Sequence, residues 1–394
     1  MVSHPPRTRV GHDRTTSAHG PRAVAALPRR LLLPAPPPAD DILEMTDQGT
    51  PLGATIRRYA MAAIAIAVVV IFTKSGAFKQ KILDKLQGAG NRATEAAVQA
   101  TASAPTGQYT LPGLRKALKT TVGEGQRDDT PAPEPPAGVL EKVFYDAPLG
   151  RNVAYVTPVR PGGARGPAIV WIVGGFGFGI DGGVWEDAPR ENDQTAAVFR
   201  KAGIAQLFPA LRGASQNPGH HECFLGEVDD ILAATDLLAK RPDVDPARIY
   251  LGGHSTGGTM VLLAAESTSR YRAVFAFGPV GDIRQYGSAS CLPAGVSAAE
   301  AKARAPMDFL SEIVSPTFII EGMKSGNGGV FPYLRRKAGK ADIHFVEVAG
   351  GTHFTTLRPG SEVIVKAILA DTGPRPSLDI TADAITLAMK TPPP

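Results

Sequence analysis

Short apolar runs alternate with amphipathic segments from about Val139 onwards. The runs are KVFYD (142–146), NVAYVTP (152–158), AIVWIVGG (168–175), IAQLFPA (204–210), RIYLGG (248–253), AVFAFG (273–278), TFIIEG (317–322) and IHFVEV (343–348). Residues 228–240 and 257–266 between them have helical spacing of apolar positions. Continuous apolar runs are typical of strands buried on both faces, so the alternation predicts an α/β fold with a mostly parallel sheet and helices on both faces. Ligands bind such sheets at the carboxyl ends of the strands.

A second apolar run, YAMAAIAIAVVVIFT, extends without a charge from Tyr59 to Thr73. As a helix it is about 22 Å long, shorter than a bilayer core of about 30 Å, although flanking Lys and Arg side chains can extend its reach. It predicts a membrane-anchor-like helix and hence a single-pass membrane protein. A cleaved signal peptide, which implies secretion, and a buried soluble helix remain open. Basic residues on both sides of the run leave open on which side of the membrane the following α/β domain lies.

The remaining composition divides the chain into segments. Residues 1–44 are rich in Arg and Pro and are predicted to be disordered; Met45 is a more conventional start, so these residues are open to being untranslated. Residues 45–78 form the signal-anchor or signal peptide, and residues 79–138 a polar helical segment that ends in the Pro-rich linker RDDTPAPEPPAG. The α/β domain, in which any catalytic site is to be sought, is expected at 139–372, followed by a C-terminal tail at 373–394.

Charge and cysteine content limit the kinds of partner and cofactor that we expect the chain to bind. The formal net charge of +5 arises largely in the N-terminal segments, and no compact basic and aromatic patch points to nucleic acid. Cys223 and Cys291 are the two cysteines, and no Cys/His cluster has metal-ligand spacing. We therefore expect no metal, no cofactor and no nucleic-acid partner.

The strongest chemical signal is a G-x-S-x-G motif from Gly253 to Gly257, between a predicted strand and a predicted helix. This context is the one that a nucleophile elbow requires: a tight strand-to-helix turn exposes the hydroxyl of Ser255, and the flanking glycines let neighbouring segments approach. The helix start behind the serine also directs free N–H groups at an oxyanion. The motif predicts Ser255 as a nucleophile.

The chain from about residue 140 to 370 resembles the α/β-hydrolase superfamily, and within it the prolyl oligopeptidase and dienelactone hydrolase branch. The eight apolar runs predict an eight-stranded sheet. The stretch from Gly281 to Pro316 is longer than a minimal connection and SAAEAKARAPMDFLSEI within it has helical spacing, which predicts a small helical cap between the sixth and seventh strands. In the loop GGFGFG (174–179), Val173 stands where relatives usually have His. By resemblance, the N–H groups of Phe176, or a neighbour, and of Thr256 form the oxyanion hole.

The base and the acid come from later loops. His353 follows the last predicted strand, in the chain order serine, acid, histidine, and is the expected base. Relatives usually have an Asp three residues after the glycine that ends the seventh strand, where this chain has Ser325. Asp282, after the sixth strand, and Glu321, at the end of the seventh, are the substitutes. We favour Asp282 slightly and keep Glu321 as the alternative acid.

Three further residues have two interpretations each. Arg212 matches an Arg-Gly pair in oligopeptidase-like relatives and is a candidate substrate contact; an ion pair with Glu222, Glu227 or Asp229 is at least as well supported. Cys223 and Cys291 are most simply two thiols, and a disulfide is open if the domain is exported.

These residues predict a serine hydrolase that cleaves a small-molecule ester or a short peptide through an acyl-enzyme on Ser255. The alternative is a catalytically weakened hydrolase-fold protein that acts as a membrane-associated binding module through residues 59–73. The missing loop acid motivates that alternative.

Overall fold

The computed structural model describes residues 110–162, 165–186 and 188–391. The predicted disordered segment, the anchor and most of the polar helical segment lie outside these residues. Within them, no helix is long and apolar enough to cross a membrane. The described residues all belong to one compact unit.

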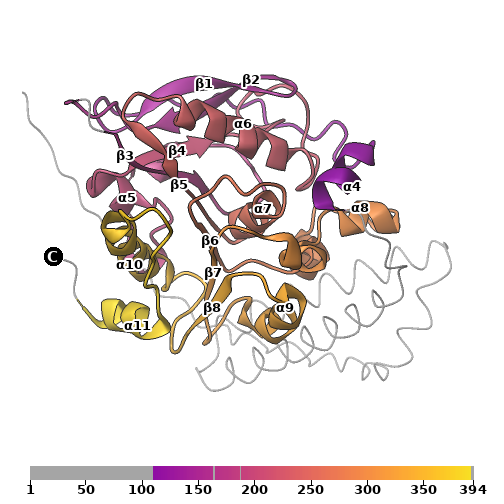
Figure 1. The fold of residues 1–394 in the computed structure, drawn as a ribbon. Coiled ribbons are helices and arrows are strands. Elements are labelled where there is room, and N and C mark those ends of the chain that lie inside the picture. The colour runs from indigo at the N-terminus through magenta and orange to yellow at the C-terminus, as the bar shows by residue number, and fades with distance from the viewer. Residues whose placement is uncertain (1–109, 163–164, 187, 392–394) are drawn as a thin grey trace, which may run out of the picture. The chain divides into compact units, whose positions relative to one another are not determined.

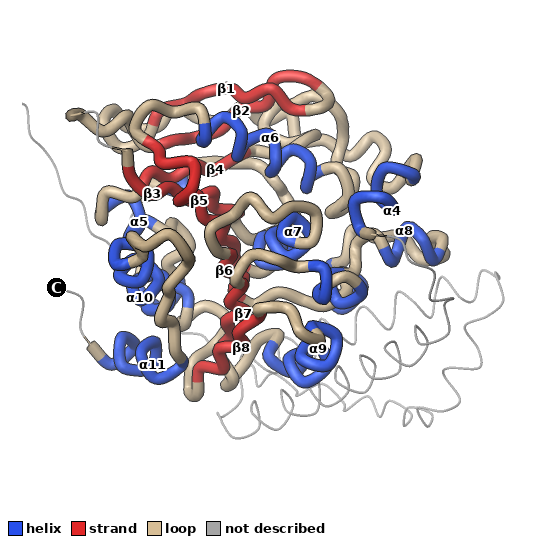
Figure 2. The backbone as a smooth tube through the Cα atoms, in the orientation of Figure 1, coloured by secondary structure: helices blue, strands red, loops and turns tan. Residues whose placement is uncertain are grey.

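A single sheet runs through the centre of this unit (Figure 2). Its strands are β1 (Glu141–Ala147), β2 (Gly150–Val156), β3 (Gly166–Ile172), β4 (Ala205–Pro209), β5 (Val244–His254), β6 (Val274–Phe277), β7 (Thr317–Gly322) and β8 (Ile343–Val348). They form an 8-stranded sheet in the order β1-β2-β4-β3-β5-β6-β7-β8. Only β2 pairs antiparallel with its neighbours, and the other pairings in this sheet are parallel. The apolar runs therefore form the strands that their pattern predicted.

Helices cover both faces of the sheet, as predicted (Figure 1). Their bounds are α4 (Leu111–Ala117), α5 (Ala197–Lys201), α6 (Glu227–Ala239), α7 (Thr256–Ala265), α8 (Ala298–Lys302), α9 (Phe331–Ala338), α10 (Leu357–Ala370) and α11 (Ala382–Lys390). Side chains alternate across a strand, so Val170 packs into one core cluster with α6 and α7, while Trp171 packs into the other with α5 and α10.

The connection between β6 and β7 is a set of short helical turns that includes η3 (Ile283–Ala289), α8, η4 (Pro306–Asp308) and η5 (Leu310–Glu312). This segment corresponds to the predicted small helical cap. A disulfide ties it to the loop after β4: Cys223 and Cys291 are bonded, with their Cα atoms 5.6 Å apart. The simpler interpretation of two thiols is therefore wrong.

Residues 110–138 pack along the compact domain. Leu111, Val122 and Ala132 are buried in its core clusters. The backbone of Asp128 donates its N–H to the Gly213 carbonyl at 2.7 Å and accepts from the Gln216 N–H at 3.2 Å. The Pro-rich stretch forms no helix or strand, and residues 110–138, which pack on the domain surface, are called the N-terminal strap below. Towards the C-terminus, α11 packs on α10 and buries Ile385.

Candidate active site

Ser255 lies on a sharp turn between β5 and α7. Its backbone has φ 57° and ψ −117°, a left-handed conformation that non-glycine residues rarely adopt. The turn is crowded on both sides: a Cβ on Gly253 would lie 2.6 Å from the Gly257 carbonyl carbon, and a Cβ on Gly257 would lie 2.2 Å from the Ile172 oxygen. The Ser255 N–H donates to the Phe277 carbonyl of β6 at 2.8 Å. The glycines of the motif thus allow the close packing that holds the strained serine in place.

The loop after β3 is fastened to this turn. The Thr256 hydroxyl donates to the Gly175 carbonyl at 2.6 Å. Since the C=O and N–H of a trans peptide point in opposite directions, this bond fixes the direction of the Phe176 N–H. The Thr256 N–H is at the first position of α7, where an amide has no acceptor within the helix. The two amides expected to form an oxyanion hole therefore lie on segments that are bonded to each other.

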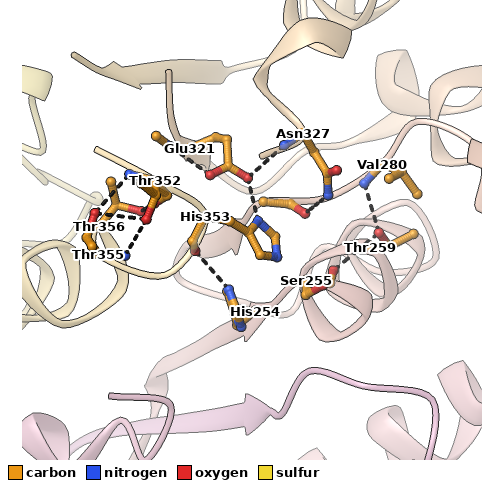
Figure 3. A network of polar contacts seen from close by, with 12 residues as sticks. His254, Ser255, Thr259, Val280, Glu321, Asn327, Thr352, His353, Thr355 and Thr356 are labelled. Atoms are coloured by element: carbon orange, nitrogen blue, oxygen red, sulfur yellow. Dashed lines mark hydrogen bonds and ion pairs between the residues drawn. The ribbon is translucent and has the colours of Figure 1, made fainter. Parts of the chain in front are cut away.

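His353 follows β8, at the position predicted for the base. Its Nδ1 lies 2.8 Å from Glu321 Oε2, and its backbone N–H donates to the Ser325 carbonyl at 2.8 Å. Because a carboxylate only accepts, Nδ1 carries the proton and Nε2 is free to accept one. Figure 3 shows the His353 ring between Glu321 and Ser255. The structure therefore brings the predicted nucleophile and base together, with a carboxylate behind the base.

Glu321 is 1% exposed and lies at the carboxyl end of β7. Its carboxylate accepts from the Gly322 N–H at 2.7 Å and from the Asn327 N–H at 3.3 Å, besides its contact with His353. Gly278 packs against the pair, since a Cβ there would lie 2.5 Å from both Glu321 Oε2 and His353 Nδ1. These bonds satisfy a buried carboxylate and hold its orientation toward the imidazole.

The preference for Asp282 as the acid is corrected by this geometry. Asp282 caps η3: its side chain accepts from the Arg284 N–H at 2.8 Å and forms an ion pair with the Arg284 guanidinium at 2.5 Å. Glu321 holds the contact with His353 instead. Ser325, at the loop position where an Asp was expected, also contributes to the site, because its carbonyl accepts the backbone N–H of His353.

Arg212 belongs to a buried ion-pair network. Its guanidinium bonds Asp230 through Nε at 3.0 Å and an amino nitrogen at 2.9 Å, and Glu222 at 2.8 Å. Asp230, rather than Glu227 or Asp229, is thus the main partner. Asp230 and Glu222 raise the pKa of Arg212 against the opposing effect of burial. The contacts support the structural interpretation of Arg212 over a substrate contact.

Aromatic rings surround the oxyanion loop. Phe176 lies edge-on to Phe224, with ring centroids 6.2 Å apart, and to Tyr286 of the cap at 5.2 Å. The Tyr286 hydroxyl is hydrogen-bonded to Thr259 Oγ1 at 2.8 Å, beneath the serine turn. The disulfide at Cys223 adjoins Phe224, so the cap and the loop after β4 are joined next to the proposed oxyanion loop.

A cleft of about 500 Å³ is lined in part by the same loop. Its lining includes Val173 and Gly174 at the end of β3, Asp181, and Asp128 and Pro131 of the N-terminal strap. The strap is therefore part of the wall next to the serine turn, which the sequence did not indicate.

Three residues of the site were not marked by any sequence pattern. His254 lies inside the serine motif but at its variable position; Asn327 and Gly278 lie in loops whose spacing carries no pattern. Asn327 donates its side-chain N–H to the Gly278 carbonyl at 2.8 Å and so ties the β6 loop to the β7 loop. Among the described residues, no group of three or more His, Cys, Asp or Glu side chains is arranged to hold a metal ion.

Comparison with known proteins finds one matching family model and several similar solved structures. A sequence model of the prolyl oligopeptidase family matches residues 192–324, a range that contains Ser255 and Glu321. Among curated proteins, no sequence matches the chain significantly.

Similar solved structures include two peptidases and an esterase. A puromycin-hydrolysing peptidase from Mycobacterium tuberculosis is 17% identical with a TM-score of 0.47, over 64% of this chain and 39% of that one. The acylaminoacyl peptidase of Pyrococcus horikoshii is 14% identical with a TM-score of 0.48, over 62% and 43%. An esterase of Pyrobaculum calidifontis is 19% identical with a TM-score of 0.45, over 60% and 86%.

The chain thus spans about two fifths of the length of the two peptidases. The resemblance to dienelactone hydrolases stays a prediction. Its strand order and the turn at Ser255 give the chain the α/β-hydrolase fold, and its residues 192–324 match the sequence model of the prolyl oligopeptidase family.

Proposed function

We propose that the protein is a serine hydrolase that transfers the acyl group of an ester or amide to water through an acyl-enzyme on Ser255. The observation that carries the proposal is the pairing of a strained serine turn with a histidine whose Nδ1 is bound by a buried carboxylate. A turn with a purely structural role requires neither the strained backbone of Ser255 nor the pairing of His353 with Glu321, whereas a nucleophile with a general base requires both.

In the first step, Ser255 Oγ attacks the carbonyl carbon of the substrate while His353 Nε2 takes the hydroxyl proton. The N–H groups of Thr256 and Phe176 bind the oxyanion of the tetrahedral intermediate. The imidazolium then gives its proton to the leaving alcohol or amine, and the acyl-enzyme remains. Glu321 keeps the proton of His353 on Nδ1 throughout and stabilises the imidazolium.

The second half repeats these steps with water. His353 takes a proton from the water molecule as the oxygen attacks the acyl carbon, and returns that proton to Ser255 Oγ as the acid product leaves. The substrates proposed are small-molecule esters and short peptides. The alternative of a catalytically weakened binding module was motivated by the missing acid in the loop. Glu321 offers a carboxylate to His353 in its place, so that motivation no longer applies.

Replacement of the nucleophile tests the proposal. Ser255→Ala is expected to abolish both labelling by a fluorophosphonate probe and hydrolysis of a short-chain p-nitrophenyl ester, a loss of about three orders of magnitude or more. Circular dichroism serves as the folding control. Thr259→Ser, which retains the hydroxyl beneath the turn, is the matched variant and should keep its labelling. Labelling that persists in Ser255→Ala would sink the assignment of the nucleophile.

A further inference from the structure

His254, the residue before the nucleophile, is buried between the segments that form the site. It is 2% exposed. Its ring centroid lies 4.6 Å from that of His353, and its Nε2 lies 3.1 Å from the backbone oxygen of His353 (Figure 3). The third segment is the loop after β3, because a Cβ on Gly174 would lie 3.2 Å from His254 Nδ1 and 3.3 Å from Ser255 Cβ.

The protonation of the ring follows from these contacts. A carbonyl oxygen only accepts, so the proton of neutral His254 is on Nε2. Nδ1 is then an acceptor, and it is buried without a hydrogen-bond partner in the described part of the chain. Burial, and then the charge of His353, lower the pKa of His254 to about 3. The ring is therefore neutral at physiological pH and adds no repulsion when an imidazolium forms on His353.

The backbone of His353 is held from two directions. Its N–H donates to the Ser325 carbonyl in the loop after β7, and its C=O accepts from His254 at the end of β5. The loop that carries His353 has no helix or strand of its own between β8 and α10. Together with the hydrogen bonds of Thr352 with Thr355 and Thr356, these two bonds hold the position from which the imidazole reaches toward both Glu321 and the serine.

We propose that His254 is a positioning residue: its Nε2–H holds the backbone carbonyl of His353 and keeps that imidazole aligned between Glu321 and Ser255. The proposal rests on the proposed function, since it assigns a role in the same reaction. It predicts a loss in kcat rather than in KM, because His254 is buried and acts on the base and not on bound substrate.

Two amide variants of His254 test whether kcat depends on the hydrogen bond from its Nε2–H or on the imidazole ring as such. The side-chain nitrogen of Gln reaches about as far as imidazole Nε2, whereas that of Asn reaches only as far as Nδ1. His254→Asn is expected to lower kcat about tenfold with KM within about twofold, the loss that one well-placed hydrogen bond predicts. His254→Gln is expected to retain kcat within about threefold of the wild type. Equal kcat values in the two variants would overturn the proposal.

A third variant keeps the test decisive if His254→Asn does not fold. His254→Phe preserves the ring contact with His353 but has no donor, so the same loss of about tenfold in kcat is expected. A Phe variant with wild-type kcat contradicts the proposal. Fluorophosphonate labelling of the wild type distinguishes the two levels: an unlabelled wild type refutes the proposed function, whereas a labelled wild type with indistinguishable variants refutes the role of His254 alone.

Discussion

At the scale of single residues, Glu321 holds the contact with His353 although the loop after β7 has no Asp. It stands at the end of a buried strand, four residues before Ser325 in the chain, and its longer side chain reaches His353 from there. Gly322 and Asn327 supply backbone donors to the same carboxylate. The loop after β7 has no Asp of its own, and its backbone binds the carboxylate of Glu321 on the strand instead.

The acid can be assigned by a matched pair of amide variants. Glu321→Gln is expected to lower kcat by about three to four orders of magnitude, because Gln offers a donor as well as an acceptor and no longer enforces the productive tautomer of His353. Asp282→Asn is the control: it retains an N-cap side chain and loses only the partly exposed ion pair with Arg284, so kcat should change less than about threefold. Steady-state kinetics on a p-nitrophenyl ester measures both. The reverse ranking would return the role to Asp282.

A second buried carboxylate, Glu266, is expected to affect the stability of the fold. It lies at the C-cap of α7, is 4% exposed, and neither of its carboxyl oxygens has a hydrogen-bond partner in the described residues. Burial, with the charges of Glu312 and Asp308, raises the pKa of Glu266 well above its usual range. The folded protein thus favours the protonated form, whereas the unfolded chain ionises at the ordinary pKa.

This difference in pKa predicts that Glu266→Gln stabilises the folded protein by an amount that increases with pH. Stability associated with the protonated carboxyl is full below the unfolded pKa of about 4.3 and is lost as the pH rises toward the higher folded value. The variant should therefore match the wild type in Tm near that lower pH and exceed it increasingly toward pH 8. Thermal melts over this range test the expectation, and Glu141→Gln, at an exposed position of β1, is the control. A constant difference across the range would contradict a buried neutral carboxyl.

At the scale of elements, the strands and the helices α6 and α7 were predictable because each has a local pattern, whereas α10, the longest helix among the described residues, was not predicted. Continuous apolar runs marked the strands, and 3.6-residue spacing marked residues 228–240 and 257–266, within one residue of α6 and α7. The serine turn was predictable for the same reason: its glycines and its position between two such elements are both local. His353 was found from its place after the last strand.

What the sequence did not predict depends on contacts between distant segments. Asp282 follows β6 and Glu321 stands at the end of β7, and only the three-dimensional structure distinguishes a carboxylate that caps η3 from one that faces His353. The disulfide joins residues separated by 68 positions, and Cys spacing alone did not decide it. His254 occupies the variable position of its motif, so its two contacts with the His353 loop have no sequence signature.

At the scale of the whole molecule, the strap of residues 110–138 changes what counts as the folded unit. The sequence predicted polar helices up to residue 122 and a Pro-rich linker from Arg127 to Gly138, with no pattern of buried positions in either. Leu111 and Val122 are nevertheless 0% and 6% exposed, and Arg115 forms an ion pair with Asp229 of α6 at 2.7 Å. The strap also lines the cleft beside the oxyanion loop. Stability and activity should therefore both depend on it.

A pair of shortened chains tests this dependence. A chain that begins at Val139 exposes the surfaces that Leu111 and Val122 cover, and burying each such side chain contributes about 1.5–3 kcal/mol. Its Tm should be lower by about 10 °C or more than that of a chain beginning at Thr110, since each kcal/mol shifts the Tm of a domain this size by about 2–4 °C. The value of kcat/KM should fall as well, because Asp128 and Pro131 leave the cleft wall. Leu111→Ala in the full chain separates the two effects: it should lower Tm and leave kcat/KM unchanged. Equal melting temperatures for the two shortened chains would mean that the strap rests on the domain without stabilising it, and the folded unit would then begin near Val139.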